Sequence, residues 1–392
     1  MTAVSDRTAQ RMALWSLLFG NFVVGTGVLL PAGLLNVLAT DLQVPPTTVG
    51  LLLFAGGLVV GIGAPVLAGL TSRFDRRVLL AVTAAIYAVG HGLAAFAPEF
   101  WSLLSIRTVT MVAAALFTPQ AAATVGLLVP SERRSEAIAF IFIGWSLASV
   151  VGIPLGSILG AEYGWRATFV GMAMLSAVAC VGVLLSLKRG MRVQPLQFSS
   201  WVAVFKNSIL LCIMAVTLLS MSGQFTVVSY LAPILREAFA ATPRNIALMF
   251  AIFGLAGVLG NYLATKAISR FGVDRAILVS LFFLIAGIGM FGVFFGNYFL
   301  ACVACAIWGL GTFSSNSLQQ SRLVGIAPAL AAATVALNTS AVYLGQSVGA
   351  AAGGSAIKDG ISANVVWMAL VFLVLAAVMS IAATGLAYKA LR

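Results

Sequence analysis

Long apolar stretches separated by short polar breaks run through the whole sequence. A transmembrane helix needs about 20 mostly apolar residues, and about twelve stretches of the chain meet that requirement. The strands of an outer-membrane barrel would be about 10 residues long and would alternate apolar with polar positions, which this chain does not do. The pattern therefore predicts an all-α integral membrane protein, with transmembrane helices over residues 13–38, 47–70, 78–97, 101–128, 137–160, 165–187, 208–235, 244–265, 276–296, 298–321, 331–357 and 364–387.

The longest polar interruption follows the sixth predicted span and covers residues 188–207. It contains Gly190 and Pro195, residue types that favour loops. The other loops are short, and short connections make successive helices pack as neighbours. We therefore expect two six-helix bundles, residues 1–187 and 208–392, joined by a cytoplasmic linker.

A short charged phrase occurs once in each half. The first copy is Ser72-Arg73-Phe74-Asp75-Arg76-Arg77, and the second is Ser269-Arg270-Phe271-Gly272-Val273-Asp274-Arg275. Arg73 and Arg270 are 270 − 73 = 197 positions apart, close to half of the 392 residues. This spacing indicates a duplicated membrane unit, as in many secondary transporters, and an even number of spans in each unit gives both the same orientation.

The composition excludes a water-soluble protein. With 61% hydrophobic residues, 8% charged residues and a mean hydropathy of +1.08, the chain has too few polar groups to cover a soluble globule of this length. The four cysteines lie within or at the ends of apolar spans, so we interpret the Cys302–Cys305 pair as packing residues and expect no metal and no cofactor.

The net charge of +12 is explained by membrane topology. On the predicted spans, 17 of the 22 basic residues fall on one side, and by the positive-inside rule that side is cytoplasmic. Both termini and the linker are then cytoplasmic, and nucleic-acid binding is an unnecessary hypothesis. The 17 residues are Arg7, Arg11, Arg73, Arg76, Arg77, Arg133, Arg134, Lys188, Arg189, Arg192, Lys206, Lys266, Arg270, Arg275, Arg322, Lys389 and Arg392.

Several motifs support a family resemblance that covers essentially the whole chain. The stretch Gly69-Leu70-Thr71-Ser72-Arg73-Phe74-Asp75-Arg76-Arg77 resembles the signature between helices two and three of the major facilitator superfamily, although many members have a further aspartate where this chain has Thr71-Ser72. The phrases Pro31-Ala32-Gly33-Leu34-Leu35 and Tyr230-Leu231-Ala232-Pro233 resemble bacterial efflux permeases for sugars, nucleosides or chloramphenicol, in the twelve-helix drug:H⁺ antiporter-1 branch. The resemblance implies two pseudo-symmetric bundles that work by alternating access.

The fifth span is the predicted hinge. Gly144, Gly152, Gly156 and Gly160 fall largely along one helical side, which lets another backbone approach closely, and Pro154 removes a backbone hydrogen bond and should kink the helix. These residues resemble the glycine and proline motif of drug and metabolite antiporters, which is thought to seal the bundle interface against leak. Simple tight packing is the alternative, but it does not compete with the hinge interpretation, since such a helix would work through tight packing at the bundle interface.

The charged phrases are the predicted cytoplasmic gate. Charges at a membrane edge can pair across helix ends in one conformation and separate in the other, each pair contributing about 1 kcal/mol when exposed. The alternative is that these residues only fix topology, but Asp75 adds nothing to a positive-inside signal. The gate candidates are Arg73, Asp75, Arg76, Arg77, Arg270, Asp274 and Arg275.

Arg107 is the most distinctive single residue. It lies six positions after Trp101, or about 9 Å further along a helix, and an intramembrane arginine is a functional candidate by default. It resembles the arginine of the superfamily's span-four motif, which is tied to coupling or substrate anchoring. The alternative is that it extends outward to lipid head groups or to Glu99.

Titratable groups inside the membrane are scarce. Every Asp and Glu falls in a loop or at a span end, which disfavours export of cationic drugs through a buried carboxylate. His91, the single histidine, lies within span three and could exchange protons near neutral pH, or it could be a neutral structural residue. His91 and Arg107 are therefore the coupling candidates.

Neutral polar and aromatic residues are the candidates for the substrate site, beside Arg107. By analogy with the superfamily, spans one, four, seven and ten line the central cavity, and span eleven could add to it. Amides and hydroxyls beside aromatic rings suit a neutral or polar organic molecule, although helix-to-helix hydrogen bonding explains many of them equally well. The candidates are Asn21, Thr26, Gln224, Tyr230, Trp308, Thr312, Ser315, Asn316, Gln319, Asn338 and Gln346.

These observations predict a transporter, not an enzyme, that exports a small organic molecule across a bacterial inner membrane, and we expect it to be monomeric. Proton antiport is what the resemblance implies. The first alternative is a uniporter or an organic-anion exchanger that uses Arg107 as its anchor without proton coupling. An ion channel or a lipid-modifying enzyme is disfavoured, because the sequence has no repeated pore filter and no cluster of His, Asp or Glu at the membrane edge.

Overall fold

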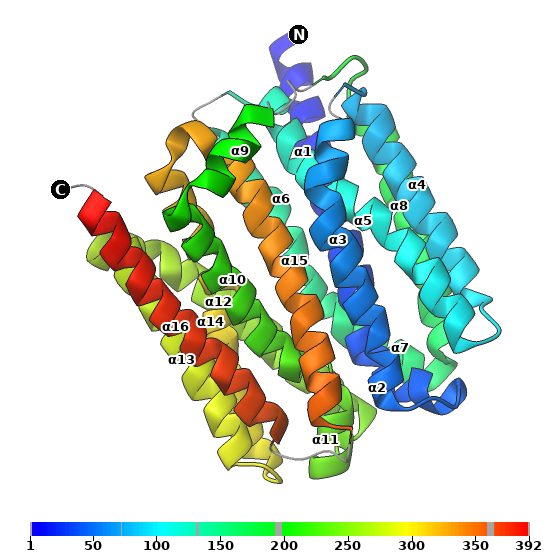
Figure 1. Cartoon of the computed structure of the whole chain (residues 1–392). Coiled ribbons are helices and arrows are strands. Elements are labelled where there is room, and N and C mark those ends of the chain that lie inside the picture. The colour runs from blue at the N-terminus through cyan, green and yellow to red at the C-terminus, as the bar shows by residue number, and fades with distance from the viewer. Residues whose placement is uncertain (1, 72, 131–132, 193–197, 359–363, 391–392) are drawn as a thin grey trace.

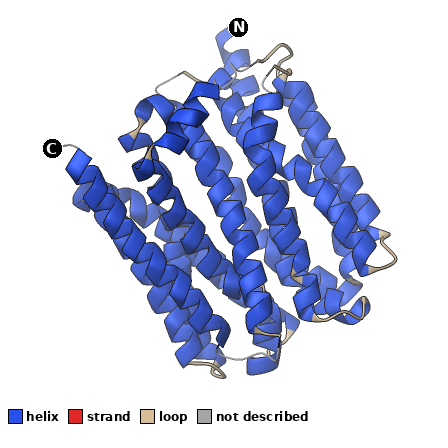
Figure 2. Cartoon of the chain, in the orientation of Figure 1, coloured by secondary structure: helices blue, strands red, loops and turns tan. Residues whose placement is uncertain are grey.

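The computed structural model describes residues 2–71, 73–130, 133–192, 198–358 and 364–390. This part of the chain consists of helices and their connections, without strands (Figure 2). Both ends of the chain lie at the same end of the helix bundle (Figure 1), as expected for an even number of transmembrane helices. The charge pattern identifies that end as cytoplasmic.

The N-terminal half forms helices from α1 to α8. They are α1 (Thr2–Asp41), the short α2 (Pro46–Val49), α3 (Leu51–Leu70), α4 (Arg76–Ala95), α5 (Phe100–Leu128), α6 (Arg134–Leu147), the π-helical segment η2 (Ala148–Gly152), α7 (Ile153–Tyr163) and α8 (Trp165–Ser186). The linker contains a helix that the sequence pattern did not predict, α9 (Phe198–Lys206).

The C-terminal half repeats this arrangement. Its elements are α10 (Ser208–Val228), α11 (Leu231–Phe239), α12 (Pro243–Phe271), α13 (Val273–Val293), α14 (Tyr298–Ile326), the 3₁₀ turn η3 (Pro328–Leu330), α15 (Ala331–Ala356) and α16 (Asn364–Ala390).

Each of the twelve predicted spans coincides with helical residues, and three of the spans are divided. Span two consists of α2 and α3, which meet at Gly50. Span five consists of α6, η2 and α7, and span seven breaks between α10 and α11. In the described part of the chain, eleven helical spans are long and apolar enough to cross a membrane. The twelfth is α15, whose 26 residues include many Gly, Ala, Ser and Thr and are therefore less apolar.

Local sequence signals set several helix boundaries. The Asp75 carboxylate accepts a hydrogen bond from the backbone N–H of Arg77 at the start of α4. Asn207 and Asn297 cap α10 and α14 through their side-chain oxygens in the same way. These caps satisfy backbone donors that the first helical turn leaves without partners.

The helices expose large apolar side chains on the outside of the molecule and bury polar side chains, among apolar ones, inside the bundles. Large apolar side chains such as Leu185 on α8 and Phe282 on α13 are more than half exposed, as expected for surfaces that contact lipid. Buried polar groups gather between helices of each half, where they can bond to one another or to backbone carbonyls. The functional candidates therefore lie inside the bundles.

Candidate transport site

Arg107 and His91 form a buried cluster inside the N-terminal half. Arg107, on α5, is 2% exposed, and its Nη2 donates to the carbonyl of Gly27 on α1 at 2.8 Å. Its Nη1 lies 3.1 Å from Nε2 of His91 on α4. The arginine therefore points into the bundle and connects three helices, rather than extending outward to Glu99.

The hydrogen bonds of His91 define its tautomer. Guanidinium nitrogens can only donate, so the Arg107 contact requires Nε2 of His91 to accept. Nδ1 then carries the proton and donates to the Tyr87 carbonyl at 2.8 Å. A second proton could be added only at Nε2, where it would face the positive charge of Arg107.

Aromatic rings close this cluster. The Phe169 ring on α8 lies 5.5 Å from the Arg107 guanidinium carbon and 5.8 Å from the His91 ring. The Tyr87 hydroxyl donates to the Val24 carbonyl of α1 at 3.1 Å. The cluster therefore connects α1, α4, α5 and α8.

The two α1 candidates lie against span five. Asn21 is buried and donates through Nδ2 to the Ile141 carbonyl of α6 at 3.1 Å. Thr26 packs against Gly152, and a Cβ atom added to Gly152 would collide with the hydroxyl oxygen of Thr26. Among the described residues, Oδ1 of Asn21 and Oγ1 of Thr26 have no hydrogen-bond partner.

The polar stripe of α14 lies inside the C-terminal half. Trp308, Thr312, Ser315 and Gln319 are all buried, and the Trp308 ring packs against Phe253 of α12 at 4.9 Å. Within the described chain, no hydrogen-bond partner lies near Nε1 of Trp308, Oγ of Ser315 or either amide atom of Gln319. Buried polar groups left this way normally bind water or a ligand.

A second polar group connects α10, α14 and α15. Asn338 accepts from the Thr217 hydroxyl at 2.7 Å and donates to Oδ1 of Asn316 at 3.2 Å. Gln224 on α10 donates to the Ser220 carbonyl, and its Oε1 has no partner in the part of the chain that the structure covers. Gln346 is buried on α15.

Tyr230 lies where the outer ends of the two halves meet, at the break between α10 and α11. Its hydroxyl donates to the Ala350 carbonyl of α15 at 3.0 Å, and its ring occupies the space that Cβ atoms on Gly50 and Gly353 would need. Nearby, Asn36 at the outer part of α1 donates to the Ala232 carbonyl at 3.0 Å. The outer ends of the halves are therefore in contact.

Span five contains the predicted hinge residues, and its helix changes character there. The π-helical segment Ala148–Gly152 is followed two residues later by Pro154, a combination at which helices bend. Cβ atoms on Gly144, Gly156 and Gly160 would collide with Leu18, Leu30 and Leu34 of α1, so these glycines permit close packing of span five on α1.

The predicted gate charges have different environments. Arg73, Arg270 and Arg275 are exposed, and Arg77 is partly buried. Asp75 accepts a hydrogen bond from the backbone N–H of Gly190, which ties the first phrase to the linker. Arg76 is buried and donates to Gln120 of α5, so it is not an exposed edge charge as the sequence pattern suggested.

The second phrase includes an ion pair that the sequence analysis missed. Nε of Arg322, on α14, lies 2.9 Å from Oδ1 of Asp274 at the start of α13. Arg322 is buried and also donates to Thr384 of α16 at 2.6 Å. The sequence signal for its burial is its position three residues after Gln319 on α14, whereas the positive-inside rule places it only on the cytoplasmic side.

Comparisons with known proteins agree with this fold. Residues 17–350 match the family model described as Major Facilitator Superfamily. The inner membrane transport protein YdhP of Escherichia coli (strain K12) is 30% identical over 350 residues, 89% of each chain. A probable sugar efflux transporter of Helicobacter pylori (strain ATCC 700392 / 26695) is 28% identical over 341 residues, 86% of each chain.

A solved structure extends the agreement to three dimensions. The crystal structure of a D-xylose-proton symporter superposes with a TM-score of 0.77 at 16% identity, covering 94% of this chain and 96% of that chain. At this identity the likeness concerns the fold alone. The matched family model, the relatives and the helical architecture agree, and the chain belongs to the Major Facilitator Superfamily as a multi-pass transporter of the inner membrane.

Proposed function

We propose that this protein exports a small, neutral, polyhydroxylated solute, of the sugar or nucleoside class, by alternating access between residues 1–187 and 208–392. The observation that carries the proposal is a set of buried, uncharged polar atoms that have no hydrogen-bond partner among the described residues of the C-terminal half. They are Nε1 of Trp308, Oγ of Ser315, both amide atoms of Gln319 and Oε1 of Gln224. An indole, a hydroxyl and two amides offer donors and acceptors without a net charge, which matches such a solute.

The relatives support the direction and class of transport. One of the relatives is named as a probable sugar efflux transporter and another as an inner membrane transport protein. Among the structural neighbours are crystal structures titled as a D-xylose-proton symporter and as a nucleoside transporter.

Proton antiport through His91 is the second part of the proposal. Adding a proton at Nε2 of His91 replaces an accepted hydrogen bond from Arg107 with charge repulsion, which should release Arg107 from α4. The charged and titratable groups found around this ring among the described residues are Arg107 and Tyr87. Protonation would thus alter packing within the N-terminal half as the transporter changes state.

The organic-anion exchanger is less well supported. Both terminal nitrogens of Arg107 already contact groups of the N-terminal half, so an anionic substrate would have to displace the Gly27 carbonyl or His91. This leaves the neutral solute as the better fit.

Thermal unfolding of the purified transporter tests the substrate class. We expect sugars or nucleosides, and not carboxylates, to raise the melting temperature, because a ligand that binds the folded state stabilises it. Gln319→Leu should remove that shift while leaving the protein folded. Gln320→Leu, at the neighbouring position, is the matched control and should keep it. Stabilisation by carboxylates alone, or an unchanged shift in Gln319→Leu, would contradict the proposed site.

A further inference from the structure

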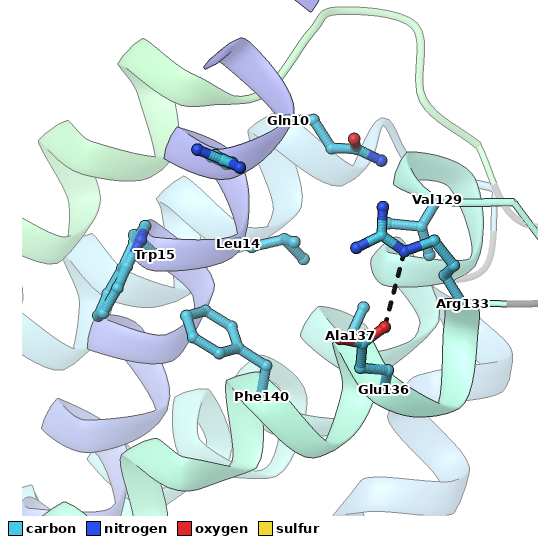
Figure 3. Close-up of a pocket in the computed structure, with 9 residues that line it drawn as sticks. Gln10, Leu14, Trp15, Val129, Arg133, Glu136, Ala137 and Phe140 are labelled. Carbon is cyan, nitrogen blue, oxygen red and sulfur yellow. Dashed lines mark ion pairs between the residues drawn. The ribbon is translucent and has the colours of Figure 1, made fainter. Parts of the chain in front are cut away.

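The cytoplasmic ends of α1, α5 and α6 border an open cavity that the transport proposal does not use. Its volume is about 510 Å³. Figure 3 shows Gln10, Trp15, Arg133, Glu136 and Phe140 around it, and Arg11 also contributes to its lining. The cavity is therefore lined by both polar and large apolar side chains.

The position of Phe140 on α6 indicates that the cavity opens toward the membrane. Trp145, on the same helix, faces the C-terminal half, since its ring lies 6.3 Å from that of Tyr343 on α15. Five residues correspond to about 140° of rotation, so Phe140 points away from the centre of the molecule. Ile143 and Leu147 share that outward side and are exposed, as lipid-facing residues are.

The apolar wall of the cavity combines two aromatic rings. Trp15 is 60% exposed, and its ring meets Phe140 edge to face at a centroid distance of 5.0 Å. Tryptophan is enriched at the level of the lipid head groups, where its ring contacts chains and its N–H contacts polar groups. This wall therefore fits the part of an acyl chain that lies next to the lipid head group.

Among the described residues that line the cavity, positive side chains outnumber negative ones. Arg11 and Arg133 contribute two guanidinium groups, and Glu136 contributes one carboxylate. The Arg133–Glu136 ion pair has an N···O distance of 3.6 Å, with side-chain exposures of 70% and 75%, so the pair is weak. A phosphate could replace the carboxylate at Arg133 at little cost.

We propose that this cavity binds an anionic phospholipid of the cytoplasmic leaflet. Its phosphate would lie between Arg11 and Arg133, with an acyl chain against Trp15, Phe140 and Ile143. The location at the cytoplasmic face, the net positive lining and the apolar wall favour a lipid over a soluble phosphate, which would leave the aromatic wall unoccupied.

Fluorescence quenching by bromine-labelled lipids tests this site in the intact transporter. The protein is reconstituted in phosphatidylcholine vesicles that contain a small fraction of bromine-labelled phosphatidylglycerol or, in parallel, labelled phosphatidylcholine. Comparison with Trp15→Phe isolates the contribution of Trp15. We expect Trp15 to be quenched by the labelled phosphatidylglycerol at a roughly fivefold lower mole fraction than by the labelled phosphatidylcholine.

Two double variants separate the site from general surface charge. Arg11→Gln with Arg133→Gln should abolish the preference for phosphatidylglycerol. Arg189→Gln with Arg192→Gln removes equal charge from exposed linker positions and should preserve it. Equal quenching by both lipids, no quenching of Trp15 by either, or a preference that survives in the Arg11 and Arg133 variant would overturn the proposal.

Discussion

Arg107 connects three helices of the N-terminal half through its side chain. Its guanidinium bonds the Gly27 carbonyl and the His91 ring, so truncation leaves two buried acceptors without their donor. Each such group costs about 1–3 kcal/mol. We expect Arg107→Ala to abolish transport and to lower the thermal stability of a protein that still folds, as measured by vesicle flux and melting temperature.

Arg166→Ala is a suitable control for that variant. Arg166 pairs with Asp41 at 2.7 Å, but both side chains are about half exposed, at 46% and 48%. An exposed pair contributes about 1 kcal/mol or less, so flux should remain close to that of the parent protein. Full transport in Arg107→Ala would show that the arginine is only structural.

At the scale of elements, the Asp274–Arg322 pair holds the cytoplasmic ends of α13, α14 and α16 together. Asp274→Asn removes the charge that faces a buried guanidinium. Because Asp274 is one-third exposed, the expected loss of stability is roughly 1–3 kcal/mol, less than for a fully buried pair. Chemical unfolding in detergent measures this loss, and Arg275→Gln, which changes an exposed charge beside it, should have little effect. Equal stability of Asp274→Asn and the parent would show that the pair contributes nothing to the bundle.

The contact between α12 and the π segment of span five is a second element-scale feature. A Cβ atom on Gly254 would lie 2.9 Å from the backbone carbon of Ser149, so Gly254→Ala should push the halves apart at this point. Spin labels at Thr40 and Glu237, both exposed near the outer ends, should report longer distances in this variant. Gly171→Ala, where the added carbon meets nothing within 4 Å, should leave the distance distribution unchanged. An unchanged distance distribution in Gly254→Ala would show that this contact does not help to hold the two halves together.

On the scale of the whole molecule, the sequence was sufficient to predict the number of membrane spans and the family. The thickness of the membrane sets the length of the apolar spans, and the positive-inside rule sets the distribution of Arg and Lys in the loops. Both features can therefore be recognised in the sequence without knowledge of tertiary contacts. Asn21, Arg107 and Gln319 are buried, as polar residues in membrane spans must be. Which bundle surface each one faces depends on helix rotation, which composition does not determine.

The sequence was less informative where two distant segments meet. The burial of Arg76 against Gln120 and of Arg322 against Asp274 follows from the packing of neighbouring helix ends. The position of Tyr230 between Gly50 and Gly353 depends on contact between the two halves. The positive-inside rule depends only on which side of the membrane a charge lies. It therefore could not distinguish the buried Arg76 and Arg322 from the exposed basic residues beside them.

Proton-driven export of a neutral solute is the central claim, and one flux measurement tests it directly. Parent protein and His91→Gln are reconstituted in vesicles, and accumulation of the labelled sugar or nucleoside that stabilises the protein most is followed with and without a pH gradient. We predict uphill accumulation only with the gradient in the parent, and gradient-independent equilibration in His91→Gln. Equal accumulation without a gradient, or gradient-driven accumulation in His91→Gln, would contradict the account.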